Sequence, residues 1–191
     1  MFYVLQNTPT TPVSLSVAKA HLRVDFNKDD TLIQSLIEAA VGWGESYTNM
    51  DFSVKEWVAS FASPCFTNYE TRPYLELKKS PINAVTSLTI SSNGTPVAST
   101  GFIRKQRPSY DRLLLTEAVV IDDSVAYTYD VSFTSGFTDL PSTHVNAILE
   151  HVAFLYENRG DVAADSNLMG MTVPKQIKML YNSKRNFSGY A

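Results

Sequence analysis

The spacing of apolar residues along this 191-residue chain changes twice, and that change constrains the fold more than any other feature. Residues 31–47 show the three- and four-residue spacing of an amphipathic helix, with Leu32, Leu36, Ala40, Trp43 and Tyr47 on one stripe. Between residues 52 and 137, short β-branched and aromatic segments alternate with Pro, Gly, Asn and Ser. Helical spacing returns from Val145 to Tyr156. The pattern predicts an α+β protein with helices at both ends of the chain and strands between them.

We expect the terminal helices to form a small helical bundle into which an antiparallel β-rich module is inserted. Residues 1–51 and 138–191 form the helical core with a C-terminal tail in this prediction, and residues 52–137 form the module. Ser14 or Ser16 can cap a short first helix, and Pro141 suits the first turn of the helix near residue 142. Seven strands are expected: Val54–Phe61, Tyr74–Leu77, Val85–Ile90, Pro96–Ser99, Phe102–Lys105, Leu113–Thr116 and Ala126–Phe133.

The charge is distributed unevenly. The net charge is −3, yet residues 171–191 carry four Lys or Arg and no acid, so the preceding 170 residues carry −7. Phosphate contacts require clustered cations, so an acidic body is a poor generic DNA binder. The basic C-terminal segment, predicted as an amphipathic helix from Pro174 to about Arg185, suits an acidic protein surface instead.

The residues do not assemble a reaction class. Neither a phosphate-binding glycine loop nor a Gly-x-Ser-x-Gly elbow occurs, and Cys65 is the only cysteine. His144 and His151 are seven residues apart on one helix, too far for one zinc ion, so we interpret them with His21 as surface or interface residues. We therefore expect no enzyme activity, no cofactor and no metal. No segment is apolar enough to suggest a signal peptide or a membrane span.

Two weaker features favour structural roles. Arg104, Lys105, Arg107 and Arg112, with Tyr110 between them, form a basic patch that favours a solvated face or a protein contact over nucleic acid. Arg159 falls near the apolar side of its helix and is expected to pair with a carboxylate or carbonyls of a neighbouring element.

Two blocks of sequence resemble the head–tail connector (adaptor) proteins of tailed bacteriophages. The first is Val13-Ser14-Leu15-Ser16-Val17-Ala18-Lys19-Ala20-His21-Leu22-Arg23-Val24-Asp25, followed by Asp29-Asp30-Thr31-Leu32-Ile33. The second runs from Gly136-Phe137 and Leu140-Pro141 through Ala147-Ile148-Leu149 to Tyr156-Glu157-Asn158-Arg159. Their order and spacing match the family, although Phe137 replaces the usual Tyr and the ending around Pro174-Lys175-Gln176-Ile177 differs.

The resemblance implies a structural subunit in the virion neck, assembled in the host cytoplasm. Subunits of that family form a ring beneath the portal, expected to be twelve-fold, which seats the tail or a tail-completion protein. DNA passes through the channel without specific binding. The C-terminal segment is expected to dock on the portal through Lys175, Lys178, Tyr181, Lys184, Arg185, Phe187 and Tyr190, so removing Met171–Ala191 should abolish portal binding. Trp43, Tyr156 and Arg159 are expected to be structural.

Two other functions stay open. A β-rich module that binds a ligand such as a glycan could stack sugars on Trp57, Tyr69, Tyr74 and Tyr110. A hydrolase would have to use Glu117, Asp122 or Asp123, although the last two are predicted to lie in a solvated turn.

Overall fold

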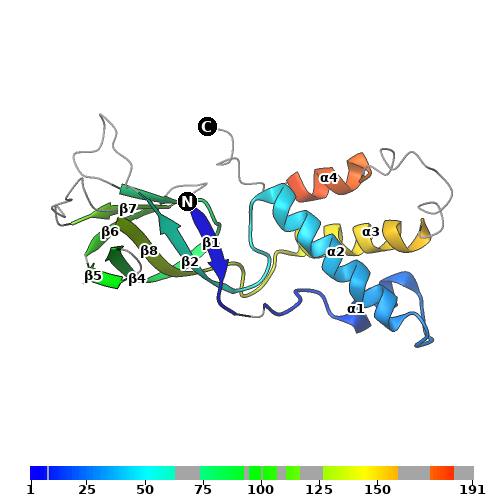
Figure 1. Cartoon of the computed structure of the whole chain (residues 1–191). Helices are drawn as coiled ribbons and strands as arrows, with labels where there is room; N and C mark the ends of the chain where they lie inside the picture. Colours follow the sequence, from blue (N-terminus) through cyan, green and yellow to red (C-terminus); the bar gives the residue numbers. More distant parts are fainter. Residues whose placement is uncertain are drawn as a thin grey trace, which may run out of the picture. The chain divides into compact units, whose positions relative to one another are not determined.

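The computed structural model describes residues 1–7, 9–62, 74–92, 95–99, 101–106, 111–116, 127–158 and 173–182. The chain divides into two compact units. The β unit contains the described residues of Met1–Pro9 and Val54–Phe137, and the helical unit those of Thr10–Ser53 and Thr138–Arg185. The predicted α+β class is confirmed (Figure 1).

The described residues of the helical unit form four helices: α1 (Leu15–Leu22), α2 (Asp30–Thr48), α3 (Ser142–Glu157) and α4 (Lys175–Asn182). Figure 1 shows α1 beside the start of α2 and α4 beside its end. The Ser14 side chain accepts a hydrogen bond from the Val17 amide and so caps α1, as expected for a serine at this position. Arg23 and Asn49 end α1 and α2 in the left-handed conformation, with φ of 57° and 56°.

The core of the helical unit lies where α2 and α3 face each other. Buried aliphatic residues of these helices fill it, together with one residue from α1 and one from α4: Ile33, Ile37, Ala40, Ile148, Val152, Ala18 and Ile177. His144 and His151 also lie in this core, 0% and 2% exposed. The prediction that they are surface or interface residues was therefore wrong.

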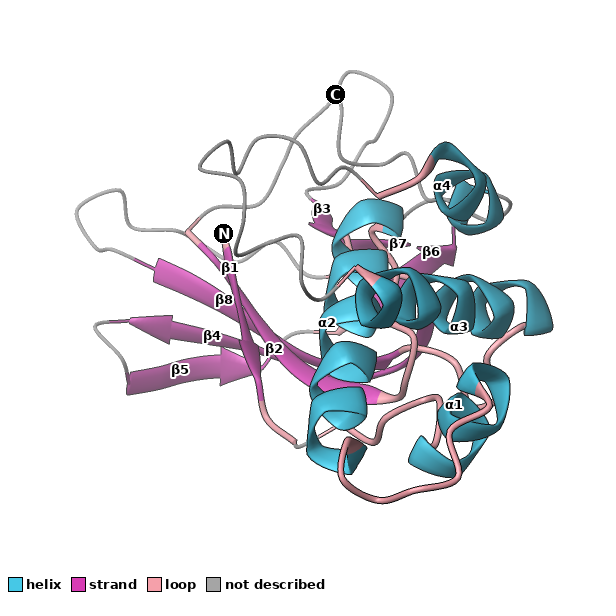
Figure 2. Cartoon of the chain, turned by 90° about the vertical axis from the view of Figure 1, so that its right-hand side faces the viewer, coloured by secondary structure: helices cyan, strands magenta, loops and turns pink. Residues whose placement is uncertain are grey.

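Two antiparallel sheets build the β unit. The five-stranded sheet has the order β1-β2-β8-β4-β5, and the three-stranded sheet the order β3-β7-β6 (Figure 2). Their bounds are β1 (Phe2–Leu5), β2 (Lys55–Phe61), β3 (Tyr74–Leu77), β4 (Ile82–Ser92), β5 (Thr95–Ser99), β6 (Phe102–Gln106), β7 (Asp111–Leu115) and β8 (Tyr127–Ser135). Strands β4 and β5 pair antiparallel, with Ser92 opposite Thr95.

The core of the β unit follows the alternation of β8, the central strand. Tyr129, Val131 and Phe133 are buried on one face, because alternate side chains of a strand point to the same side of the sheet. On the other face, Asp130 accepts hydrogen bonds from the hydroxyls of Ser60 in β2, at 2.5 Å, and Ser91 in β4, at 3.2 Å. This face therefore ties β8 to both neighbouring strands.

Strand β1 was not expected. The sequence pattern assigns residues 1–51 to the helical core, but Phe2–Leu5 pairs with residues 57–60 of β2. The Tyr3 ring packs edge-on against Trp57 and Phe133, with centroids 6.1 and 6.2 Å apart. A four-residue edge strand at a chain end is too short for its alternation to be recognised, and only its partner strand fixes it.

Candidate assembly surfaces

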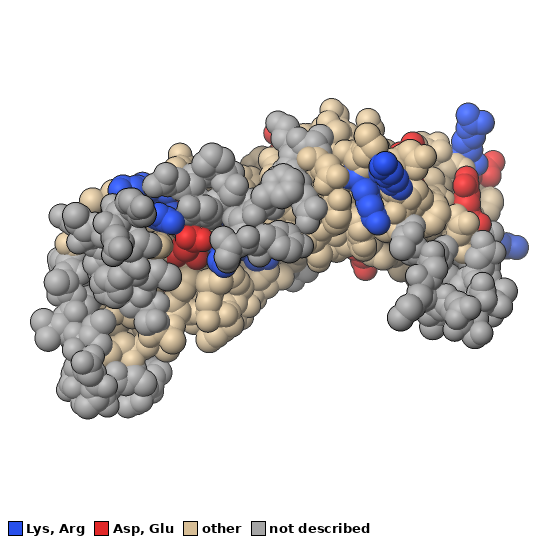
Figure 3. Space-filling model, turned by 90° about the horizontal axis from the view of Figure 1, so that it is seen from above, with Lys and Arg blue, Asp and Glu red and all other residues tan. Residues whose placement is uncertain are grey.

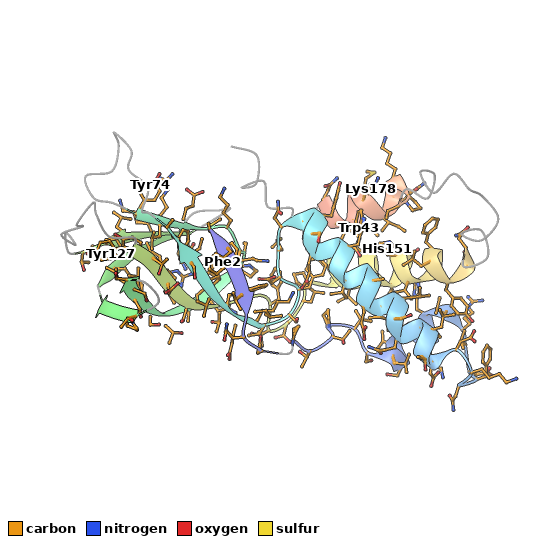
Figure 4. All side chains as sticks on the ribbon, viewed as in Figure 1. Phe2, Trp43, Tyr74, Tyr127, His151 and Lys178 are labelled. Atoms are coloured by element: carbon orange, nitrogen blue, oxygen red, sulfur yellow. The ribbon has the colours of Figure 1, made fainter. Side chains whose placement is uncertain are left out.

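Helix α4 is held against α2 and α3 by six rings, which we call the aromatic seat. Its members come from four segments of the chain: Trp43, Tyr47, Phe52, His144, His151 and Tyr181. Tyr181 lies at its centre and is 0% exposed. Figure 4 shows Trp43 and His151 lying together beneath α4.

The rings of the aromatic seat meet in stacked and edge-on geometries. Trp43 stacks on Tyr47 with centroids 4.7 Å apart, and Phe52 stacks on Tyr181 at 6.1 Å. His151 meets the Trp43 ring edge-on at 5.2 Å. Such pairs each add about 0.5–1.5 kcal/mol beyond the area that they bury. The seat thus fixes α4 as part of the fold.

Gly44 is required at the aromatic seat. A Cβ at this position would lie 2.7 Å from both Phe52 Cε2 and Tyr181 Cε1. The absence of a side chain lets the two rings approach the backbone of α2. Gly42, two residues earlier, has no atom within 4 Å of an added Cβ. Only one of the two glycines is therefore needed for packing.

Burial controls the protonation of the seat. Removal from solvent lowers the pKa of His151 to about 4 and raises the pKa of the Tyr181 phenol. Both side chains are therefore neutral at pH 7. The Tyr181 hydroxyl lies 3.4 Å from the Ala40 carbonyl, to which it donates.

The residues expected to dock on the portal separate into three groups. Lys175 is exposed and Lys178 half-buried on the outer side of α4. Tyr181 is in the core, so its expected docking role is corrected: the side chain has no surface to offer a partner. Lys184, Arg185, Phe187 and Tyr190 lie outside the described residues.

Trp43 and Tyr156 both bridge elements of the helical unit. The half-buried Trp43 joins α2 to His151 of α3 and Tyr181 of α4. The Tyr156 hydroxyl donates to Asp29 Oδ2 at 2.6 Å. Arg159 lies outside the described residues, and its structural role stays a prediction.

A second surface lies on the other flank of α2. Leu15 of α1 and five residues of α2 line an open depression of about 420 Å³: Asp30, Thr31, Gln34, Ser35 and Glu38. Lys19 pairs with Asp30 at its margin, at 2.6 Å, and Gln34 donates to Glu38 at 3.1 Å. The sequence did not predict this surface, because polar residues on the outward face of a helix such as α2 are typical of any solvent-exposed face. The depression exists only where α1 packs beside them.

The basic patch of the β unit is engaged within the protein. Arg104 pairs with Asp111 and donates to the carbonyls of Ile82 and Asn83. Arg112 lies 3.5 Å from Glu76 and stands over the Tyr74 ring, 4.5 Å from its centroid. Lys105 is exposed, and Arg107 and Tyr110 lie outside the described residues.

The rings that could stack on a sugar are covered or lie outside the described residues. Tyr74 is 5% exposed beneath Arg112. Trp57 carries the Lys79 ammonium 4.2 Å from its ring centroid and packs on Tyr3. Tyr69 lies outside the described part, as do Glu117, Asp122 and Asp123 of the hydrolase alternative. Tyr74 and Trp57 therefore offer no free ring face on which a sugar could stack.

The described ranges hold no group of three or more His, Cys, Asp or Glu side chains placed to bind a metal ion. None of the helices that the structure describes is long and apolar enough to cross a membrane.

Comparison with known proteins adds two findings. Residues 12–93 match the family of phage gp6-like head–tail connector proteins. Among curated proteins, none matches the chain significantly.

Solved structures extend the likeness to almost the whole chain. A chain from the neck of an empty gene transfer agent particle, computed with C6 symmetry, aligns at a TM-score of 0.74 and 20% identity, with 97% of this chain and 96% of that chain covered. A chain of the native gene transfer agent virion aligns at 0.73 and 21% identity over the same shares. A chain from the native neck with C12 symmetry aligns at 0.61 and 20% identity, covering 96% and 95%. The expected resemblance is thus confirmed: the chain is similar to the phage gp6-like head–tail connector proteins over residues 12–93, and it shares the fold of gene transfer agent neck proteins.

Proposed function

We propose that this protein is a structural head–tail connector subunit that forms a ring in the neck of a virion, between the portal and the tail. The observation that carries the proposal is the combination of two matches. The connector family matches residues 12–93, and the fold matches neck proteins over 97% of the chain, so the β unit as well as the helical unit has a counterpart there.

The ring is proposed to contain twelve copies. The similar neck chains come from structures computed with C6 and C12 symmetry. A closed ring needs one head-to-tail interface, in which two different surfaces of each subunit meet. The helical unit offers two such surfaces, the outer face of α4 and the depression beside α1.

DNA is proposed to pass the ring without being bound. The chain carries −3 overall and −7 outside residues 171–191. The affinity of proteins for DNA grows with the number of phosphates that Lys and Arg neutralise. In the β unit, Arg104 and Arg112 are already paired with carboxylates, which leaves fewer cations to hold a sliding duplex.

Portal docking is proposed for the segment after Asn182, with Lys184, Arg185, Phe187 and Tyr190. Removing all of Met171–Ala191 is a poor test, because it also deletes Ile177 and Tyr181 from the core. The sharper variant ends at Asn182 and keeps α4.

The test is copurification with a portal protein from the same virus, followed by electron microscopy. The full chain is expected to form a symmetric ring on the portal, and the variant ending at Asn182 to lose portal binding while it keeps its helical content. A full-length chain that neither binds the portal nor appears in virion necks contradicts the proposed function. Binding by the shortened variant with unchanged affinity contradicts only the docking segment. A glycan array that binds the full chain at micromolar concentration would favour the glycan-binding alternative.

A further inference from the structure

We propose that the outer face of α4 on one copy packs into the depression between α1 and α2 on the next copy. The inference rests on the ring proposed above and names the interface that closes it. Its components are Lys175, Lys178 and Met179 on one side, and Leu15, Asp30, Thr31, Gln34, Ser35 and Glu38 on the other.

The two surfaces lie on opposite flanks of α2. Trp43 and Tyr47 face α4, as their contacts with Tyr181 and Asn182 show. Gln34 and Glu38 precede these residues by nine positions each, which is two and a half turns at 3.6 residues per turn. They therefore point to the other side of the helix. Two complementary surfaces on opposite flanks of one subunit cannot contact each other within that subunit. In a head-to-tail ring, each surface contacts the complementary surface of a neighbouring copy.

The charges of the two surfaces are complementary. Helix α2 carries Asp30, Glu38 and Glu45 and no cation, whereas α4 carries Lys175 and Lys178 and no acid. Glu38 and Glu45 lie on the α2 flank that faces away from α4, and Asp30 lies at the start of the helix beside α1. Asp30 is paired with Lys19, and Glu45 accepts a hydrogen bond from the Phe52 amide, so Glu38 is the principal acid that faces outward. Figure 3 shows basic side chains standing clear of the surface over α4.

The outer face of α4 also offers an exposed apolar side chain to the depression. Met179 is 63% exposed, the largest fraction among the exposed large hydrophobic residues of the described chain. It lies one turn after Lys175, on the side of α4 opposite the buried Ile177 and Tyr181. The depression is lined by one apolar residue, Leu15, and by five polar or acidic residues. A flexible Met can fill such a site while the neighbouring lysines pair with Glu38.

In this assignment, two parts of the C-terminal region contact different partners. Lys175 and Lys178 contact the neighbouring copy, and the portal contact falls to the residues after Asn182. The aromatic seat then contributes to assembly, because it holds α4 in the orientation in which its outer face contacts the neighbouring copy.

Disulfide trapping tests the interface directly in the full-length chain. Cys65 is replaced with Ser, and Met179→Cys is combined with Ser35→Cys. Within one chain, Ser35 lies eight residues before Trp43, about 12 Å along α2, whereas Met179 lies on the outer side of α4. The two Cα atoms are therefore farther apart than the roughly 7 Å that a disulfide spans. Every bridge therefore joins two copies. The expected result under mild oxidation is a ladder of covalent oligomers that ends at the ring. The matched control pairs Met179→Cys with Asn146→Cys, which is exposed on α3 outside the proposed contact.

Charge reversal adds an independent readout. Glu38→Lys alone, or Lys175→Glu with Lys178→Glu, is expected to slow trapping by about threefold or more, the scale of one or two exposed ion pairs. Combining all three reversals restores the opposite charges and is expected to recover most of the wild-type rate. Circular dichroism of each variant establishes that the helical unit is folded.

Three outcomes overturn the interface. They are trapping no faster than that of the control pair, a triple reversal as slow as its parents, and lysine reversals that abolish portal binding but leave trapping unchanged. The last outcome assigns the lysines to the portal. If trapping fails while rings still form on the portal, the inference fails and the proposed function stands. If the full chain forms no ring and binds no portal, the proposed function fails instead.

Discussion

The hydroxyl of Tyr156 donates a 2.6 Å hydrogen bond to the Oδ2 atom of Asp29, 127 positions earlier in the chain. Tyr156 lies in the last turn of α3, and Asp29 directly precedes α2. The bond therefore ties the end of one long helix to the start of the other. A carboxylate at the start of α2 is also favoured by the partial positive charge of a helix N-terminus.

Removing this hydroxyl should weaken the helical unit. Tyr156→Phe keeps the ring and deletes the donor to a carboxylate, so we expect a loss of about 1–2 kcal/mol in the free energy of unfolding. Urea denaturation followed by Trp43 fluorescence in a Trp57→Phe background measures this unit. Tyr47→Phe is the control: its hydroxyl bonds the exposed Asn182 at 3.1 Å, and we expect less than about 1 kcal/mol. A larger loss in the control than in Tyr156→Phe contradicts the prediction.

The two glycines of α2 should respond in opposite directions to the same substitution. Gly44→Ala places a Cβ 2.7 Å from two rings of the aromatic seat and is expected to cost about 1–3 kcal/mol. Gly42→Ala enters open space in a helix and is expected to stabilise by about 0.5–1 kcal/mol. Thermal unfolding of both variants measures the difference. Equal shifts of the same sign would show that the seat does not depend on close packing at Gly44.

The local elements of this fold could be predicted because their signals are local. The spacing in α2 and α3, the Ser14 cap and the alternation along β8 are all carried by neighbouring residues. Strand β1 could not, because it depends on pairing with residues more than fifty positions away. The order of the two sheets likewise follows from distant pairings.

The candidate surfaces were harder to predict than the elements. His144 and His151 occupy the buried arc of α3 together with Ala147 and Ile148, whereas Val145 and Tyr156 are only half-buried. In a sequence, a histidine that lies beside strongly apolar residues is readily assigned to the surface. Only the ring contacts of His144 with Phe52, and of His151 with Trp43 and Tyr181, show that both histidines lie in the core. The predicted docking role of Tyr181 was wrong for the same reason. A tyrosine on a basic helix resembles a docking residue in the sequence, and only its packing against Trp43 and Phe52 shows that it is buried.

Burial of His151 predicts that the helical unit loses stability in mild acid. Its pKa is lowered to about 4 in the folded chain, against about 6.5 when unfolded. Above pH 6.5 neither state binds the proton, so His151 causes no pH dependence there. Between pH 6.5 and 4 only the unfolded state binds it, so stability falls as pH falls, by up to about 3 kcal/mol. Urea denaturation at pH 7 and pH 4.5, followed through Trp43, measures the loss.

Substitution of the histidines identifies the source of that acid sensitivity. His151→Leu removes the titrating group, so the drop in stability between pH 7 and pH 4.5 should shrink by most of the His151 contribution. His21→Gln is the matched control, because His21 is exposed on α1, 3.8 Å from Glu150. It should keep the wild-type drop. The same drop in all three proteins would mean that His151 binds a proton in the folded chain.

In the β unit, Asp130 should contribute more than its place on the outer face of β8 suggests. Its two oxygens accept from Ser60 and Ser91, whose side chains belong to the strands on either side and are 7% and 6% exposed. Asp130→Ala leaves both hydroxyls without this partner, and we expect a loss of about 2–3 kcal/mol. Asp130→Asn keeps one acceptor oxygen and should lose less.

The control is Ser132→Ala, two residues along the same face, which should change stability by no more than about 0.5 kcal/mol. Urea unfolding followed by Trp57 fluorescence in a Trp43→Phe background measures all three. If Asp130→Ala matches Ser132→Ala, the two serines find other partners and the bridge is not what holds β8 between β2 and β4.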